Sequence, residues 1–277
     1  MLLSIVWDVS PEIFNFPEWI PLIGGNGVRW YGLLFAASFV VGYIIMQRVF
    51  KREKIPVEVL DELSTYMLVA TVIGARLGHC LFYEPSYYLA NPIEILKVWE
   101  GGLASHGAAV GIILALYFFS RKHKKTMIWV LDRVVIVVAL AGFFIRMGNL
   151  MNSEIFGHAT TLPWGFYFIR YYDTTMHADP RHPTQIYEGI VYLLTFIFLY
   201  RSYFTKGLGE KQPGFIFGWF LMLIFGSRFF VEFLKEPQVG FEANMALNMG
   251  QLLSIPFVLA GAYIWWKGYK KNKTLNT

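Results

Sequence analysis

The sequence predicts an all-α integral membrane protein with about seven transmembrane helices. Of its 277 residues, 56% are hydrophobic and only 16% are charged, and the mean hydropathy is +0.45. Apolar runs recur along the chain at close to the roughly 20 residues that a membrane-spanning helix needs. Most of the charged residues lie between these runs. This composition excludes an ordinary soluble enzyme.

Seven runs have the length and composition of membrane spans. They cover about residues 30–50, 63–82, 103–120, 127–145, 185–200, 215–234 and 251–266. The segments 1–29 and 83–102, which contain proline and aromatic residues, are expected to lie at the membrane interface. The stretch 146–184 is too polar to span and is predicted to form a small folded cap. Because no repeat or linker is visible, we expect one domain over residues 1–277.

Lysine and arginine are distributed unevenly between the two sides of the predicted membrane protein. The connections on one side hold 14 of these residues, whereas those on the other side hold 6. Because basic residues concentrate in cytoplasmic loops, the N-terminus is predicted to lie outside and the C-terminus in the cytoplasm. The cap, His106 and the end of the sixth run then face the outer side. The same bias explains the net charge of +5, so no nucleic-acid partner is expected.

A polar cluster at the end of the fourth run is the strongest functional signal. Arg146, Asn149, Asn152 and Glu154 lie within nine residues, where an apolar helix should be leaving the bilayer. Ionisable groups at such a depth are costly and usually face a cavity or a partner. The first three share a helix face if the helix continues, and line a turn if it ends near Gly148. Either arrangement suits an anionic headgroup; the alternative is an interfacial arginine that snorkels beside ordinary loop residues.

Two further groups of residues suggest chemistry. Arg228 and Glu232 are four residues apart, so they form either a structural ion pair or a site in which Glu232 positions Arg228 toward a phosphate. His106 begins the third run, where a helix N-terminus favours anions, and is the best-placed base for a thiol or hydroxyl. The alternative for His106 is an interfacial hydrogen-bonding group. Arg76 and His79 share a helix face and are expected to support packing or headgroup contact.

The remaining motifs are less specific. The segment 182–188 predicts a polar helix entry, since Pro183 suits a helix start and Gln185 and Glu188 are three apart. Cys80, the single cysteine, is expected to be a packed thiol. No spacing of histidine or cysteine resembles a metal site and no nucleotide-binding loop is present, so no metal site is expected. The residues alone indicate a membrane protein that handles an anionic lipid; a transporter or flippase for an anionic phospholipid is the alternative.

Six short motifs occur together and in a fixed order. They are residues 29–32 (RWYG), 74–78 (GARLG), 101–107 (GGLASHG), 146–157 (RMGNLMNSEIFG), 182–188 (HPTQIYE) and 228–232 (RFFVE). Through these motifs the chain resembles the prolipoprotein diacylglyceryl transferase family, from the first run to the sixth. Each motif alone is weak, whereas six in sequence are highly specific.

The resemblance implies transfer of the diacylglyceryl group of phosphatidylglycerol to the lipobox cysteine of a preprolipoprotein. It implies a thioether product, released glycerol phosphate, no cofactor, and a multi-pass location in the bacterial plasma (inner) membrane with the active site toward the extracytoplasmic side. Arg146 would bind the lipid phosphate, Arg228 would stabilise the departing phosphate with Glu232 orienting it, and His106 would take the thiol proton. The residues expected to shape the headgroup pocket are Tyr31, Asn149, Asn152 and Glu154.

Overall fold

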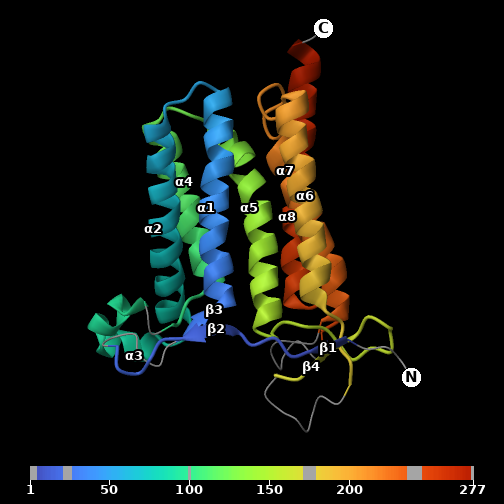
Figure 1. The fold of residues 1–277 in the computed structure, drawn as a ribbon. Helices are drawn as coiled ribbons and strands as arrows, with labels where there is room; N and C mark the ends of the chain where they lie inside the picture. Colours follow the sequence, from blue (N-terminus) through green and yellow to red (C-terminus); the bar gives the residue numbers. More distant parts are fainter. Residues whose placement is uncertain (1–4, 21–26, 99–100, 171–178, 236–244, 276–277) are drawn as a thin grey trace. The chain divides into compact units, whose positions relative to one another are not determined.

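The computed structural model describes residues 5–20, 27–98, 101–170, 179–235 and 245–275, and these are mostly helical (Figure 1). The helices are α1 (Trp30–Arg52), α2 (Val57–Phe82), α3 (Pro85–Ala90), α4 (Ser105–Lys122), α5 (Met127–Met151), α6 (Thr184–Lys206), α7 (Phe215–Val231) and α8 (Met249–Leu275), with the 3-10 helices η1 (Pro92–Leu96) and η3 (Glu232–Leu234). The strands are β1 (Ile5–Trp7), β2 (Glu12–Asn15), β3 (Gly27–Arg29) and β4 (Phe166–Phe168). These short strands correct the all-α prediction to a mostly helical fold.

Five of the described helices are long and apolar enough to cross a membrane. They are Trp30–Arg52, Val57–Phe82, Met127–Met151, Phe215–Leu234 and Met249–Asn272. The predicted spans at α4 and α6 are helices as well, but they are not among these five. α4 has only 18 residues and ends in two basic residues, and α6 carries buried polar side chains along one face. The chain is therefore a helical membrane protein whose apolar helices match the length of a bilayer.

Several predicted boundaries differ from those in the structure. α5 continues through the polar cluster to Met151, so residues 146–151 belong to a helix and not to the cap. α2 begins at Val57, six residues before the predicted start at 63, because the polar first turn of the helix masks its apolar period. The loop predicted at 83–102 contains α3 and η1.

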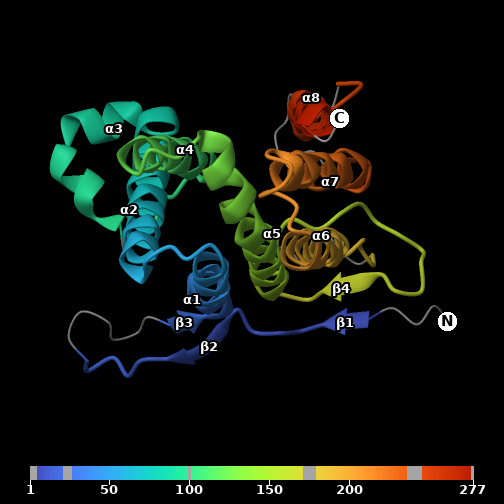
Figure 2. The same ribbon diagram turned by 90° about the horizontal axis from the view of Figure 1, so that it is seen from above.

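The chain divides into two compact units, and the boundary between them falls within α1 and α5. One unit comprises Met1–Gly42 and Val134–Thr277, and the other comprises Tyr43–Arg133. In the first unit, α6, α7 and α8 lie side by side in that order (Figure 2). Gly218 and Gly261 allow the close approach of α7 and α8, since a Cβ on Gly261 would lie 2.7 Å from the carbonyl oxygen of Gly218.

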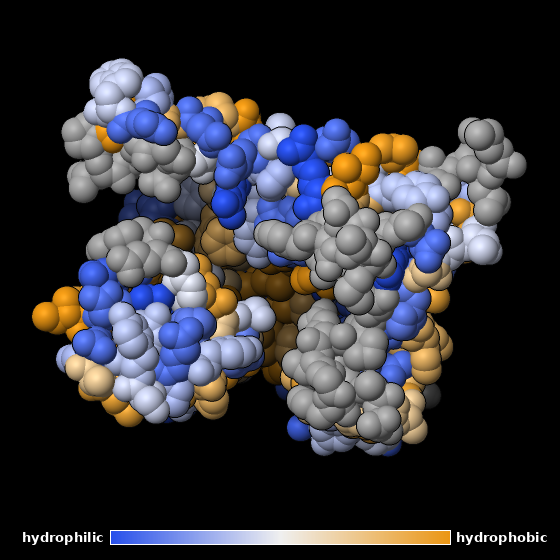
Figure 3. Space-filling view, turned by 90° about the horizontal axis from the view of Figure 1, so that it is seen from below, coloured by the Kyte–Doolittle hydropathy of each residue, from blue (hydrophilic) through white to orange (hydrophobic). Residues whose placement is uncertain are grey.

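A small hydrophobic cluster joins the N-terminal strand of the first unit to the end of α5. It contains Leu150, Phe156, Phe166 and Phe168, with Trp7 packed against it. β1 pairs in parallel with β4, and the Trp7 indole Nε1 donates to the Leu150 carbonyl oxygen at 3.0 Å. Hydrophilic side chains predominate at the end of the helices that carries these segments (Figure 3). The polar end of α5 is thus anchored by a buried apolar cluster.

In the second unit, glycines bring α2 and α4 into close contact. A Cβ on Gly78 would lie 2.6 Å from the Cα of Gly107, and one on Gly74 would lie 2.6 Å from the Gly107 carbonyl oxygen. Gly111 meets the Ala70 carbonyl oxygen in the same way. Small residues four apart let helix backbones approach within a membrane, where the hydrophobic effect does not drive association. This packing explains the glycines of the motifs at 74–78 and 101–107, and it places the first turn of α4.

Candidate active site

The predicted polar cluster forms a connected hydrogen-bonded group at the end of α5. Arg146 Nη1 donates to Asn149 Oδ1 at 3.2 Å, so the prediction that these residues share a helix face is confirmed. Asn149 Nδ2 and Asn152 Nδ2 donate to the same oxygen, Glu154 Oε1, at 2.8 and 3.3 Å. The helix ends at Met151, so Asn152 and Glu154 lie in the turn that follows. Both arrangements considered for this cluster therefore contribute to one site.

Tyr31 is positioned against this cluster by α1. A Cβ on Gly148 would lie 2.7 Å from Tyr31 Cδ2, so a glycine is required where the two helices meet. The half-buried Tyr31 ring therefore lies against α5 at Gly148, between Arg146 and Asn149 in the sequence. The structure brings Tyr31 together with the residues of the predicted headgroup pocket.

Glu188 is the main partner of Arg146 and is absent from the site residues that the sequence predicts. Arg146 Nε lies 2.9 Å from Glu188 Oε2, and Nη2 donates to Oε1 at 3.3 Å. The Glu188 side chain is fully buried, and that of Arg146 is 13% exposed. Tyr192 follows Glu188 by one turn of α6 and is also buried. Because a buried carboxylate requires a close cation, Glu188 holds the guanidinium at a defined place and orientation.

The start of α6 also fixes the turn after α5. Thr184 Oγ1 donates to the Ile155 carbonyl oxygen at 2.9 Å, and Gln185 Nε2 donates to the Glu154 carbonyl oxygen at 2.6 Å. Ile155 has a φ of +59°, a strained conformation for a β-branched residue that persists only where the surroundings hold it. The motif at 182–188 is therefore more than the polar helix entry expected: it anchors the site loop and supplies Glu188.

Arg228 and Glu232 form the predicted ion pair, and it belongs to a longer series of charges. Arg228 Nε lies 3.4 Å from Glu232 Oε1, and Lys235 Nζ lies 3.1 Å from the same oxygen. Lys235 Nζ also lies 3.0 Å from Glu188 Oε1. Arg146, Glu188, Lys235, Glu232 and Arg228 are thus connected in that order, and we call these five residues the charge chain. The two predicted phosphate-binding arginines occupy its two ends.

The two arginines differ in exposure. The Arg228 side chain is 40% exposed, whereas Glu232, its partner, is 9% exposed. Asn248 Nδ2 donates to Glu232 Oε2 at 3.2 Å, and a Cβ on Gly250 would lie 2.6 Å from Glu232 Oε1. Glu232 is therefore held from several sides, which leaves much of the Arg228 guanidinium open to a ligand.

His106 belongs to the second compact unit, whereas the arginine cluster belongs to the first. Its exposed ring occupies the first turn of α4, 5.6 Å from the Phe82 ring and 5.7 Å from the Tyr83 ring, measured between centroids. His79 stacks on the same Tyr83 ring at 5.7 Å. His106 is thus accessible and set in an aromatic surround at the start of a helix.

Arg76 holds the segment that precedes α4. It donates to four backbone carbonyl oxygens: from Nη2 to Glu94 at 2.6 Å, from Nε to Ile95 at 3.0 Å, and from Nη1 to Gly101 at 2.6 Å and Gly102 at 3.4 Å. The guanidinium also lies 5.0 Å from the centre of the Tyr88 ring, and the residue is 3% exposed. Of the two roles considered for Arg76, packing and headgroup contact, these contacts favour packing. Cys80 is fully buried, as predicted.

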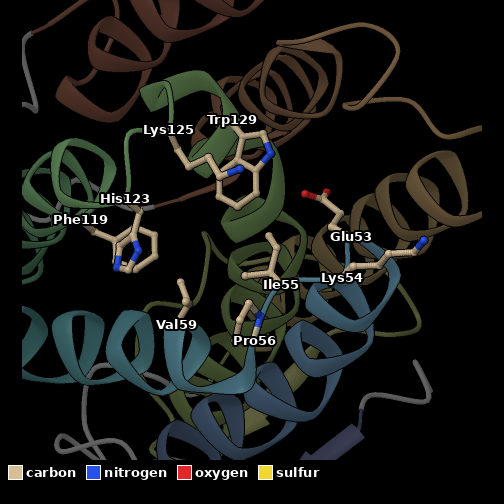
Figure 4. A pocket seen from close by; sticks show the side chains of 9 residues that line it. All are labelled: Glu53, Lys54, Ile55, Pro56, Val59, Phe119, His123, Lys125 and Trp129. Carbon is tan, nitrogen blue, oxygen red and sulfur yellow. The ribbon is translucent and has the colours of Figure 1, made fainter.

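A pocket of about 330 Å³ lies elsewhere in the second unit, at the turns that follow α1 and α4 (Figure 4). It is lined by Glu53, Lys54, Ile55, Pro56, Val59, Phe119, His123, Lys125 and Trp129. Two of its basic side chains are already engaged: His123 Nε2 lies 3.2 Å from Glu62 Oε2, and Lys125 Nζ lies 4.9 Å from the centre of the Trp129 ring. The pocket contains none of the predicted site residues and lies at the opposite end of α4 from His106.

The fold and the site define a multi-pass helical membrane protein in which buried carboxylates hold two arginines. Residues 17–267 match the prolipoprotein diacylglyceryl transferase family. The chain belongs to this family.

Curated relatives cover nearly the whole chain. A phosphatidylglycerol–prolipoprotein diacylglyceryl transferase of Tolumonas auensis is 48% identical over 258 residues, which cover 93% of this chain and 95% of the relative. Proteins of the same name from Chloroherpeton thalassium and Porphyromonas gingivalis are 46% and 45% identical; the alignments cover 96% and 94% of this chain and 95% and 93% of the relatives. The relatives thus align with both compact units.

Proposed function

We propose that this protein transfers the diacylglyceryl group of phosphatidylglycerol to the lipobox cysteine of a prolipoprotein. The observation that carries the proposal is the family match over residues 17–267, supported by relatives that bear the name of this reaction. The charge chain adds a physical reason, because two arginines held by buried carboxylates suit a substrate that carries a phosphate.

The reaction is a displacement at a saturated carbon. The cysteine sulfur forms a bond to the glyceryl carbon that carries the phosphate ester, and the bond between that carbon and the ester oxygen breaks. The electron pair of the broken bond leaves with glycerol phosphate, and the thiol proton passes to a base. This step requires a thiolate, a stabilised leaving group and close orientation of the reactants, and it requires no cofactor.

In this mechanism the two arginines have different tasks. Arg146, fixed by Glu188 and Asn149, binds the phosphate of the lipid. Arg228, whose guanidinium is partly exposed, compensates the negative charge that grows on the phosphate as the ester bond breaks. Glu232 orients Arg228. His106 is the proposed base for the thiol proton, since it is an exposed imidazole at the start of a helix.

The headgroup glycerol is proposed to bind beside Arg146. Asn152 Oδ1 is buried and has no hydrogen-bond partner within the described parts of the chain. A buried acceptor without a partner is unfavourable, and a glycerol hydroxyl could donate to it. Asn149, Glu154 and Tyr31 complete the proposed pocket, with Glu154 holding both amides in place.

We further propose a single transferase domain with seven spans, in the plasma (inner) membrane of a bacterium. α4 and α6 would be the additional spans, because both expose large apolar side chains that suit contact with lipid. These are Val110, Ile113, Leu114 and Phe118 on α4, and Ile190, Leu194 and Ile197 on α6. The distribution of lysine and arginine favours an external N-terminus, a cytoplasmic C-terminus and an active site and cap on the extracytoplasmic side.

The proposal is tested with purified protein, phosphatidylglycerol and a lipobox peptide in mixed micelles. Phosphatidylglycerol should be consumed only when the peptide carries its cysteine. A peptide with serine at that position should not react, because an alcohol is a much poorer nucleophile than a thiolate at neutral pH. Movement of the lipid across a vesicle membrane in the absence of peptide, with no thioether formed in its presence, would instead support a transporter.

A further inference from the structure

We propose that Lys235 is a positioning residue that ties the carboxylates of Glu188 and Glu232 together, so that Arg146 and Arg228 form one phosphate-binding unit. The inference rests on the proposed function, which supplies the phosphate. Lys235 would act through the two carboxylates, without touching the substrate.

The ammonium group of Lys235 lies where the two carboxylates meet. Its side chain is 2% exposed, and Nζ lies 3.0 Å from Glu188 Oε1 and 3.1 Å from Glu232 Oε1. An ammonium has three donor hydrogens and is costly to bury unless they are paired. Lys235 is therefore held by both carboxylates and restricts the separation between them.

The backbone of Lys235 is fixed to the loop that follows the arginine cluster. Gly157 and Lys235 form an antiparallel bridge, and the His158 amide donates to the Leu234 carbonyl oxygen at 2.8 Å. A Cβ on Gly157 would overlap the same carbonyl oxygen, so only glycine allows this approach. The end of the motif that begins at Arg146 thus holds the residue that bridges to the other arginine.

Each carboxylate of the charge chain is shared between an arginine and Lys235. Within the charge chain, three cations face two carboxylates, which leaves an excess of one positive charge for a phosphodiester with one negative charge. Without Lys235, Glu188 and Glu232 would each rely on an arginine alone for charge compensation, and the cation that bridges the two carboxylates would be lost. The two arginines would then bind the phosphate less well as a pair.

The test uses the full-length protein with Lys235→Arg, Lys235→Met, Arg146→Lys, and the combination of Lys235→Met with Arg146→Lys. Leu199→Ala, which removes a fully buried side chain elsewhere on α6, serves as a control for loss of stability. For each variant we measure kcat and KM for phosphatidylglycerol, the thermal unfolding midpoint, and the rise in that midpoint on addition of short-chain phosphatidylglycerol.

Lys235→Arg should stay within about threefold of the wild-type kcat, because arginine can also bridge two carboxylates. Lys235→Met should lose about 10- to 100-fold in kcat, as expected when reacting groups are misplaced. Leu199→Ala should keep the wild-type kcat when it is assayed at a temperature well below its unfolding midpoint. Adding Lys235→Met to Arg146→Lys should lower kcat further by no more than about twofold, because residues that act through one another are not additive.

An undiminished kcat in Lys235→Met overturns the inference. The inference also fails if Lys235→Met lowers kcat by the same factor in the wild type and in Arg146→Lys. If the wild type shows no transfer, the proposed function fails, and the lipid-induced rise in the unfolding midpoint decides the role of Lys235. A rise that is lost in Lys235→Met and kept in Lys235→Arg supports the positioning role. An equal rise in all three proteins, or none in the wild type, refutes it.

Discussion

Replacing Arg146 with lysine should lower the transfer rate about 30- to 1000-fold, because one charge-assisted contact to the reacting anion is worth about 2–4 kcal/mol. The structure explains why the charge alone is insufficient. Arg146 contacts Glu188 through Nε at 2.9 Å and Nη2 at 3.3 Å, and Asn149 through Nη1 at 3.2 Å. A lysine has a single nitrogen, so it cannot hold the Glu188 carboxylate, reach Asn149 and grip a phosphate through a planar fork.

The assay is the initial rate of glycerol phosphate release at saturating lipobox peptide, with the thermal unfolding midpoint measured in parallel. Arg170→Lys is the matched control, since the 45% exposed Arg170 side chain pairs with Asp8 at 2.7 Å in the same unit. The control should retain full activity, because exposed ion pairs contribute little. Wild-type activity in Arg146→Lys would refute the phosphate-binding role of Arg146.

Four further predictions concern activity, pH and topology. Arg228→Ala should lose at least as much activity as Arg146→Lys with little change in the unfolding midpoint, because its carboxylate partner keeps two other contacts; wild-type kcat in this variant would contradict its role. The kcat defect of His106→Gln should shrink as the pH approaches about 8.5, the ordinary pKa of a thiol, whereas a constant defect would exclude its role as the base. Burial and the nearby His158 lower the pKa of His182 in the folded protein, so the unfolded protein takes up this proton first as the pH falls. The unfolding midpoint should therefore fall as the pH drops below about 6.5. His182→Asn should weaken this pH dependence, and an unchanged dependence would contradict the pKa shift. In a Cys80→Ser background, an impermeant thiol reagent should label Thr161→Cys from outside intact cells and Lys211→Cys only after the membrane is opened. Labelling of both variants from outside would contradict the proposed topology.

Local spacing predicted the contacts made within a single helix or the turn that follows it. The period of the α-helix placed Arg146 and Asn149 on one face, and the structure confirms a hydrogen bond between them at 3.2 Å. The same rule predicted the pair of Arg228 and Glu232, whose Nε and Oε1 atoms lie 3.4 Å apart. Such contacts follow from the helix geometry alone, because residues three and four apart are neighbours on its surface.

Long-range contacts could not be predicted in this way. Glu188 lies 42 positions from Arg146 and 47 from Lys235, so no period connects them. The signal available was a glutamate on the polar face of α6 within a motif, which required a cation partner at membrane depth. The strands β1 and β4 have three residues each, too few to show an alternating pattern, and they pair across most of the chain.

The central claim is that the protein forms a thioether between a lipobox cysteine and a diacylglyceryl group. Mass spectrometry of the peptide after incubation with purified protein and phosphatidylglycerol tests this claim most directly. We predict that the peptide gains one diacylglyceryl group on its cysteine and that one glycerol phosphate is released for each modified peptide. An unmodified peptide in the presence of folded protein and phosphatidylglycerol would contradict the account.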